Sequence, residues 1–195
     1  NRETLDAYEE VARQYAPRGL DALRARVEHA QLLSPQDIPR FGRLGVIASM
    51  QPTHATSDMR WAERRVGVER LRGAYAWASL LRSGARLAFG SDFPVESPEP
   101  LAGIYAAALR EDAHGEPAGG WIPSERLTRE EAVRAFTAGA AYAAFEEQVK
   151  GTIAPGKRAD LVVLSRDVLT CDPNEILTTR VEMTIVGGEV VYAAR

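Results

Sequence analysis

Short runs that read as strands alternate with segments of helical periodicity along residues 1–150, and this alternation limits the fold more than any other feature of the sequence. The runs that predict strands are Ala25–Ala30, Val46–Met50 and Leu87–Phe89. Arg2–Gln14 and Glu69–Arg82 place apolar residues at helical spacing among charged ones. Strands that alternate with helices are typical of parallel sheets, in which helices make the crossovers. We therefore predict an α/β fold with a parallel sheet or barrel.

Local signals predict where two further helices begin. Ser34-Pro35 combines a capping residue with a proline at the first helical position, which predicts a helix to about Arg43. Thr128 and Glu131 have the spacing of a capping box, in which each side chain bonds the other's backbone N–H. This box predicts a long Ala-rich helix that ends at about Phe145.

From Gly151 onward the pattern changes to β-type runs separated by turns. These runs are Asp160–Leu164, Val181–Val186 and Glu189–Tyr192. Gly187-Gly188 stands between the last two runs, and two adjacent glycines favour a two-residue hairpin turn. We predict a domain boundary near Lys150, with a small β-domain over residues 151–195.

Composition argues against several classes of partner. The formal net charge is −3, and acidic and basic residues are mixed without a basic block, so no nucleic-acid partner is expected. The uncharged, Ala-rich stretch Ala135–Phe145 is far shorter than the roughly 18 apolar residues that cross a bilayer. Cys171 is the single cysteine, which excludes a disulfide within one chain and fits a cytoplasmic setting. The chain begins with Asn1 and a charged amphipathic stretch, so we expect it to start inside a longer protein.

Two potential metal ligands, His29 and Asp92, stand where predicted strands end. In parallel α/β folds, sites assemble at the C-terminal ends of strands, because the loops there vary while the strands stay rigid. Imidazole and carboxylate together suit zinc or a similar divalent ion. Spacing alone leaves other roles open: a hydrogen-bonded core histidine for His29 and a turn aspartate after Gly90-Ser91 for Asp92.

Several segments together resemble the amidohydrolase superfamily, in particular its type 3 branch of N-substituted formamide deformylase-like enzymes. The segments are NRETLDAYEE, RVEHAQ, SMQPTHATSD, LAFGSDFPVE, KGTIAPGKRADLVVL and VEMTIVGGEVVY. In this resemblance His29 corresponds to the metal-binding histidine of the sixth strand and Asp92 to the metal-binding aspartate of the eighth. The last two segments resemble the accessory β-domain of the family.

The resemblance implies a fold and an activity. The expected fold is the C-terminal part of a TIM-type (β/α)8 barrel over residues 1–150, followed by an accessory β-sandwich over residues 151–195. The expected activity is hydrolysis of a non-peptide carbon–nitrogen bond in a small amide, formamide or cyclic amide by a metal-bound hydroxide. The expected cofactor is a divalent metal, with zinc favoured. His29 is then a metal ligand, and Asp92 both binds metal and accepts the proton of the attacking water.

Part of the family's site has no counterpart in this chain. The family takes ligands from a His-x-His on its first strand, a lysine or glutamate on its fourth and a histidine on its fifth. The histidines here are His29, His54 and His114, and the lysines are Lys150 and Lys157. We therefore expect a C-terminal fragment that is inactive alone and associates as a homodimer or with the missing N-terminal part.

Other residues are weaker candidates. His54 follows a predicted strand within the turn-prone Gln51–His54, where it could contact substrate or be a solvated loop histidine. Asp58 could touch substrate or cap a helix over Met59–Arg65, and the second role is favoured. His114 is expected at the solvated surface. Three aromatic residues are expected in the core or in a pocket wall: Trp61, Tyr75 and Trp77.

Two alternatives to carbon–nitrogen hydrolysis remain at this stage. The fold could persist as a non-catalytic regulatory or binding module with vestigial ligand positions. It could also cleave a carbon–oxygen or phosphoester bond. Retention of both His29 and Asp92 favours a hydrolase, because a vestigial site has no need of either.

Overall fold

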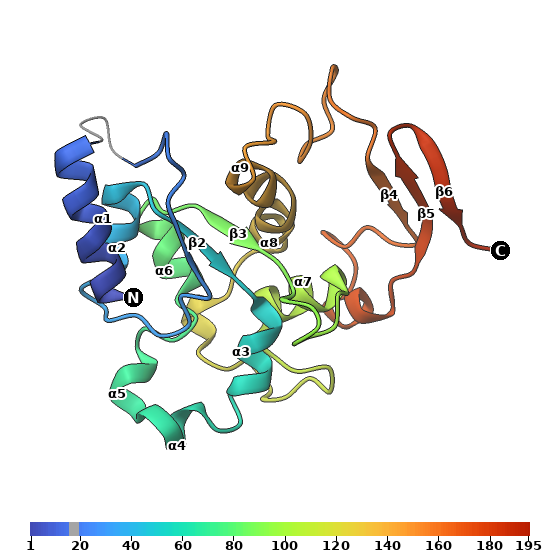
Figure 1. The fold of residues 1–195 in the computed structure, drawn as a ribbon. Coiled ribbons are helices and arrows are strands. Elements are labelled where there is room, and N and C mark those ends of the chain that lie inside the picture. The colour runs from blue at the N-terminus through green and yellow to red at the C-terminus, as the bar shows by residue number, and fades with distance from the viewer. Residues whose placement is uncertain (16–19) are drawn as a thin grey trace.

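The structure is a computed structural model that describes residues 1–15 and 20–195, and it contains two three-stranded sheets (Figure 1). The first is parallel, with the order β1 (Arg26–Glu28), β2 (Ile47–Met50) and β3 (Leu87–Phe89). The second is antiparallel, with the order β4 (Leu161–Leu164), β5 (Val181–Val186) and β6 (Glu189–Ala193). The predicted mixed α/β organisation is confirmed, with its parallel part first and its antiparallel part last.

The parallel sheet is buried because apolar side chains line up across its strands. Val27, Ala48 and Leu87 are paired in register and all belong to the main hydrophobic cluster. Three helices pack on this side of the sheet (Figure 1): α1 (Arg2–Tyr15), α2 (Ile38–Leu44) and α6 (Trp77–Arg82). They contribute buried side chains to the same cluster, among them Phe41 and Leu80. Burial on this scale favours the packed sheet, at about 25 cal/mol per Å² of apolar surface removed from water.

Two predicted helices differ from those observed. Helix α2 begins at Ile38 rather than at Ser34-Pro35, since those residues form a turn in which Asp37 N–H donates to the Ser34 carbonyl. The single helix expected over Glu69–Arg82 is instead divided into α5 (Val68–Leu71) and α6. Gly73 lies in the break, and a Cβ there would come within 1.8 Å of the Leu33 carbonyl oxygen. That close approach between distant segments replaces the helix.

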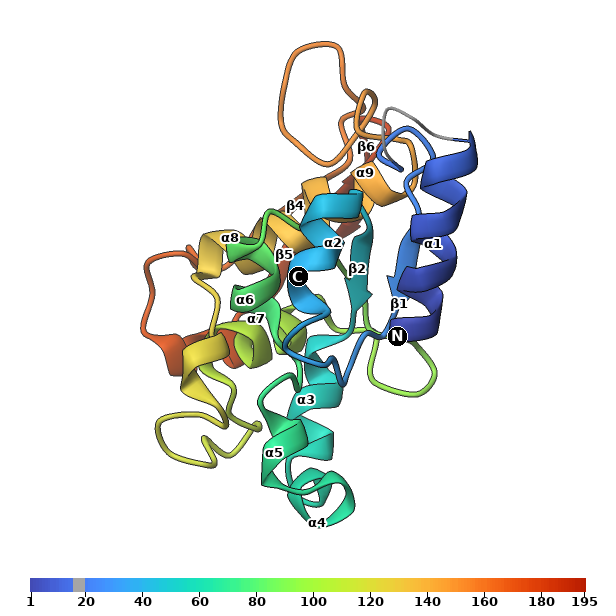
Figure 2. The same cartoon turned by 90° about the vertical axis from the view of Figure 1, so that its left-hand side faces the viewer.

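Residues Gln51–His54, expected as a turn, instead lead into helix α3 (Pro52–Asp58). Pro52 occupies the first helical turn, where its missing N–H costs no hydrogen bond and its fixed φ suits the helix. Helix α4 (Ala62–Val66) follows. The segments α3, α4 and α5 extend from the end of the sheet toward which the β2 arrow points (Figures 1 and 2).

The Ala-rich helix is confirmed, and its start has the predicted capping box. Thr128 Oγ1 accepts from Glu131 N–H at 3.1 Å, and Thr128 N–H donates to Glu131 Oε2 at 2.8 Å. The helix comprises α8 (Arg129–Arg134), a π-helical turn η2 (Ala135–Gly139) and α9 (Ala140–Ala143). Gly139 lies against β3, where a Cβ would meet the Leu87 carbonyl oxygen at 2.2 Å.

The C-terminal part contains the antiparallel sheet. Gly187 and Gly188 have φ of 60° and 87°, values that suit glycine, and they form the predicted hairpin turn between β5 and β6.

Helix α7 (Pro100–Leu109) packs against the 3₁₀ helix η3 (Pro173–Thr178), and a further 3₁₀ turn, η1, covers Pro123–Glu125. None of the helices in the described ranges is long and apolar enough to cross a membrane.

Candidate metal centre

The C-terminal edge of the parallel sheet brings His29, His54 and Asp92 together. His29 directly follows β1, and its N–H donates to the Ser49 carbonyl at 2.7 Å, which continues the pairing with β2. His54 lies in the first turn of α3, just after β2. Asp92 follows β3, past Gly90, whose N–H donates to the Met50 carbonyl. Each residue therefore comes from the end of a different parallel strand.

The three side chains converge at distances that suit a shared ion. Potential ligand atoms of His29, His54 and Asp92 all lie within 4.8 Å of one another. Asp92 Oδ2 is 4.0 Å from His29 Nε2 and 3.7 Å from His54 Nε2. These separations are too long for hydrogen bonds. They are compatible with two donor atoms that share a single zinc ion, each at about 2.0–2.2 Å from it.

His54 carries the clearest sign of an absent ligand. Its side chain is buried, with a residue exposure of 7%, and its Nε2 has no hydrogen-bond partner among the described residues. A buried polar atom without a partner costs about 1–3 kcal/mol. The imidazole of His54 stacks on that of His29, with ring centroids 5.6 Å apart. A cation or a polar substrate atom beside Nε2 would remove this cost.

Backbone strain accompanies two of the three residues. His29 has φ of 67° and Asp92 has φ of 61°, in the left-handed region. Histidine and aspartate enter this region more readily than most residues, although a non-glycine residue held there costs about 1–3 kcal/mol. The strain turns the chain sharply at the end of each strand, where the two side chains meet.

An open cavity of about 450 Å³ surrounds the three residues. Its other lining residues are Gln31, Asp58, Trp61, Val95 and Glu96. The sequence favoured Asp58 as a helix cap, and this prediction is wrong, because helix α4 begins after Trp61. The Asp58 carboxylate accepts a hydrogen bond from the Tyr75 hydroxyl and another from Gln31 Nε2 at 3.2 Å. Sequence reasoning missed Gln31 and Glu96; the only signal for Gln31 was its place two residues after His29.

Comparison with known proteins identifies the family. The model of the amidohydrolase family matches residues 1–192, nearly the whole chain. The chain belongs to the amidohydrolase family. The family resemblance read from the sequence is therefore confirmed.

Curated relatives support this assignment. The chain is 33% identical over 193 residues to N-substituted formamide deformylase of Arthrobacter pascens, with 96% of the chain and 34% of that protein covered. It is 40% identical over 189 residues to Protein LONG AFTER FAR-RED 3 of Arabidopsis thaliana, with 96% of the chain and 31% of that protein covered. The chain thus spans about one third of the length of these relatives.

Solved structures show the same fold. An uncharacterized metal-dependent hydrolase from Pyrococcus furiosus superposes with a TM-score of 0.68 at 34% identity, over 85% of this chain and 31% of that one. Atrazine chlorohydrolase TrzN from Arthrobacter aurescens TC1, complexed with zinc, superposes with a TM-score of 0.62 at 22% identity, over 93% of this chain and 38% of that one.

The remaining candidate residues of this amidohydrolase chain are three aromatic residues and His114. Tyr75 and Trp77 are buried in the core, where their rings meet edge to face. Trp61 is 46% exposed and belongs to the cavity wall. His114 is exposed, and its backbone N–H donates to Asp112. The expectations for the aromatic residues and for His114 are confirmed.

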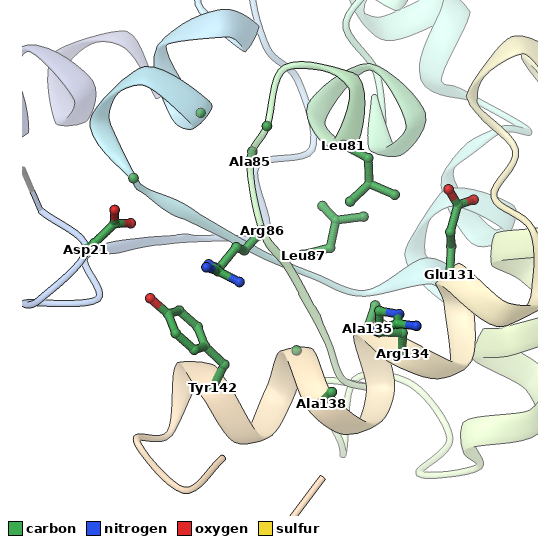
Figure 3. A pocket seen from close by; sticks show the side chains of 14 residues that line it. Asp21, Leu81, Ala85, Arg86, Leu87, Glu131, Arg134, Ala135, Ala138 and Tyr142 are labelled. Carbon is green, nitrogen blue, oxygen red and sulfur yellow. The ribbon is translucent and has the colours of Figure 1, made fainter. Parts of the chain in front are cut away.

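A larger cavity, about 570 Å³, opens beside the N-terminal end of β3 and the long Ala-rich helix (Figure 3). Arg86 and Tyr142 point toward one another there, and the guanidinium lies 4.3 Å from the ring centroid. None of the three converging residues lines this cavity. Its place at the start of β3 separates it from the strand ends that carry the candidate metal ligands.

Proposed function

We propose that the protein to which this chain belongs is a divalent-metal-dependent hydrolase that cleaves the carbon–nitrogen bond of a small amide, formamide or cyclic amide. One observation carries the proposal: donor atoms of His29, His54 and Asp92 converge within 4.8 Å at the ends of parallel strands. The family and the similarity to N-substituted formamide deformylase support the choice of bond.

The residues fit a metal ion, and zinc is the preferred one. Two imidazoles and a carboxylate form a donor set that zinc binds well. The buried Nε2 of His54, which has no hydrogen-bond partner within residues 1–15 and 20–195, supports a ligand at this point. When bound, such an ion polarises the substrate carbonyl and lowers the pKa of a coordinated water. His29 and Asp92 would hold it.

Asp92 has a second proposed role as the proton acceptor. A carboxylate beside a cation stays ionised at neutral pH, so it can take the proton of the attacking water and return it to the leaving amine. Its side chain is 37% exposed, which leaves room for water and substrate beside it.

His54 is proposed to bind the substrate carbonyl through Nε2. His54 Nε2 lies 3.7 Å from Asp92 Oδ2, and His29 Nε2 lies 4.0 Å from the same atom. The geometry therefore also accommodates His54 as a third metal ligand. The metal content of a His54→Ala variant separates these roles. A ligand loses the ion, whereas a substrate contact loses only activity.

The expected fold of the longer protein is also a proposal. The order β1-β2-β3, all parallel with intervening helices, supports the C-terminal part of a (β/α)8 barrel over residues 1–150. The antiparallel strands support an accessory β-domain over residues 151–195. Association with another copy or with the rest of the longer protein, and a cytoplasmic location, complete the proposal.

The test is turnover by the full-length protein. Zinc-loaded protein is assayed against amides, formamides and cyclic amides, with esters and phosphoesters alongside. The proposal expects amide-type hydrolysis that a chelator abolishes and added zinc restores. Preference for esters or phosphoesters would reassign the chemistry, and inactivity of the metal-loaded protein toward every class would favour a non-catalytic binding module.

A further inference from the structure

Asp58 lies where its side chain can contact a bound substrate. It lies four residues after His54 on α3, and residues at this spacing share a helix face with Cβ atoms about 5–6 Å apart. Asp58 also lines the open cavity that contains His29, His54 and Asp92. A group bound by Asp58 would therefore lie roughly one helical turn from the carbonyl bound at His54.

One carboxylate oxygen of Asp58 is held by two neighbours. Oδ2 accepts from the Tyr75 hydroxyl and from Gln31 Nε2, and Gln31 Nε2 also lies 2.6 Å from the Tyr75 hydroxyl oxygen. Tyr75 is a rigid anchor, because it is only 2% exposed and packs edge to face on Trp121. Burial, and then the Asp58 carboxylate, raise the pKa of Tyr75 above its usual value, so its hydroxyl stays protonated and donates.

The other oxygen of Asp58 is available. In the described ranges no hydrogen-bond donor reaches Oδ1, and no lysine or arginine forms an ion pair with Asp58. The nearby Arg60 pairs with Asp112 instead. A carboxylate that lines a cavity, with one oxygen held and the other without a donor, is preorganised to accept a donor from a ligand.

The rest of the cavity wall favours a cation. Neither lysine nor arginine lines it within the part of the chain that the structure describes. Glu96 adds a second carboxylate, which accepts from the Ser57 hydroxyl at 2.7 Å. Trp61 adds a half-exposed aromatic ring, but the Arg65 guanidinium already lies 5.7 Å from its centroid, so the attraction for a cation comes from the two carboxylates.

We propose that Asp58 is a specificity-determining residue, and that its Oδ1 accepts a hydrogen bond from an ammonium group on the amine side of the substrate. The preferred substrates are then amides that carry a cationic amine roughly one helical turn, about 5–6 Å, from the scissile carbonyl. This inference rests on the proposed hydrolase function, because it assumes that the carbonyl binds at His54.

The experiment uses the full-length, zinc-loaded protein and two formamides of similar size. N-(2-aminoethyl)formamide carries an ammonium group, and N-propylformamide is its neutral counterpart. The wild-type ratio of kcat/KM for these two substrates is expected to favour the cationic one by at least about tenfold, since a hydrogen bond between charged partners is worth that much. A wild-type ratio near one overturns the proposal without any variant.

Variants separate recognition from structure. Asp58→Asn keeps the shape of the side chain and is expected to lower the ratio of kcat/KM for the cationic over the neutral formamide at least about tenfold. Glu63→Gln, which removes one exposed negative charge on α4, is expected to keep it. If Asp58→Asn lowers both substrates equally, the residue is structural and the proposal is wrong.

A binding measurement keeps this test apart from that of the proposed function. If the wild-type protein hydrolyses neither formamide, the proposed bond class fails, and the dissociation constants of the two compounds are compared by calorimetry. Tighter binding of the cationic compound that Asp58→Asn abolishes supports recognition by Asp58, whereas equal binding overturns it.

Discussion

The two sheets of this chain have the same number of strands but opposite surroundings. Every residue of β3 is buried, whereas every residue of β6 is exposed. The parallel sheet receives helices from its own segment of chain, which cover the face that bears Val27, Ala48 and Leu87. The antiparallel sheet leaves Val190 and Val191 in solvent, with Val191 61% exposed. Burial here follows from what packs on a strand and much less from how apolar the strand is.

The candidate metal ligands belong to only one of these two sheets, the buried parallel one. The converging residues His29, His54 and Asp92 all lie at the ends of the buried sheet, where rigid strands fix their positions. The exposed sheet carries no such group of metal-binding side chains in the described ranges. Its strands expose valines instead, among them Val162, which lines an apolar cavity of about 510 Å³.

The largest effect is expected at the end of the buried sheet. In the full-length protein, Asp92→Asn should lower turnover by more than about a hundredfold, because it removes the proton acceptor. Asparagine tolerates the left-handed backbone at this position, so the fold should be kept. Initial rates at saturating zinc measure the loss. Glu189→Gln on the exposed β6 is the control and should behave as wild type; if Asp92→Asn keeps more than about a tenth of the activity, Asp92 is not the base.

The second prediction concerns zinc binding by this chain alone. Catalytic zinc sites use three protein ligands and a water, whereas this chain supplies only two, His29 and Asp92, if His54 binds substrate as proposed. Zinc should therefore bind weakly and be lost on dialysis against a mild chelator, whereas the full-length protein keeps it. Stoichiometric retention by the chain would show that His29, His54 and Asp92 complete a site by themselves.

The third prediction compares the stability of the two regions. Phe41 is fully buried among the helices that cover the parallel sheet. Phe41→Ala should lower the free energy of unfolding of the full-length protein by about 3–5 kcal/mol. Leu169→Ala, at a half-exposed site in the C-terminal part, should cost less than about 1 kcal/mol. Urea unfolding gives both values, and similar costs would contradict the contrast in packing.

The smallest effect is expected in the association of this chain alone. Its exposed β-strands should make it self-associate at high concentration, because unpaired apolar edges promote strand pairing. Val191→Lys on β6 should reduce this association, and light scattering measures it. A well-dispersed wild-type monomer with cooperative unfolding would show that the exposed sheet needs no cover.

Sequence patterns predicted the parts of this structure that depend on local signals. The strands, the capping box at Thr128 and the glycine hairpin follow from periodicity, side-chain chemistry and backbone freedom. Helix α3 was missed because Pro52 suits a turn and a first helical turn equally well. The break at Gly73 was missed because it depends on contact with Leu33, which lies far away in sequence.

The same limit applies to the site. His29 and Asp92 could be selected because they end strands, and strand ends meet at one edge of a parallel sheet. The hydrogen bonds that hold the Asp58 carboxylate could not be predicted, since Tyr75 and Gln31 reach it from segments 17 and 27 residues away. Contacts of this kind appear only when the chain is folded.

The most direct test of the metal centre is the metal content of the purified full-length protein and its single variants. Elemental analysis after zinc loading and dialysis should find stoichiometric zinc in the wild type and in His114→Ala, which changes an exposed histidine away from the site. His29→Ala and Asp92→Ala should each lose most of the bound zinc. Wild-type zinc content in both of these variants would contradict the account, because the ion would then lie elsewhere.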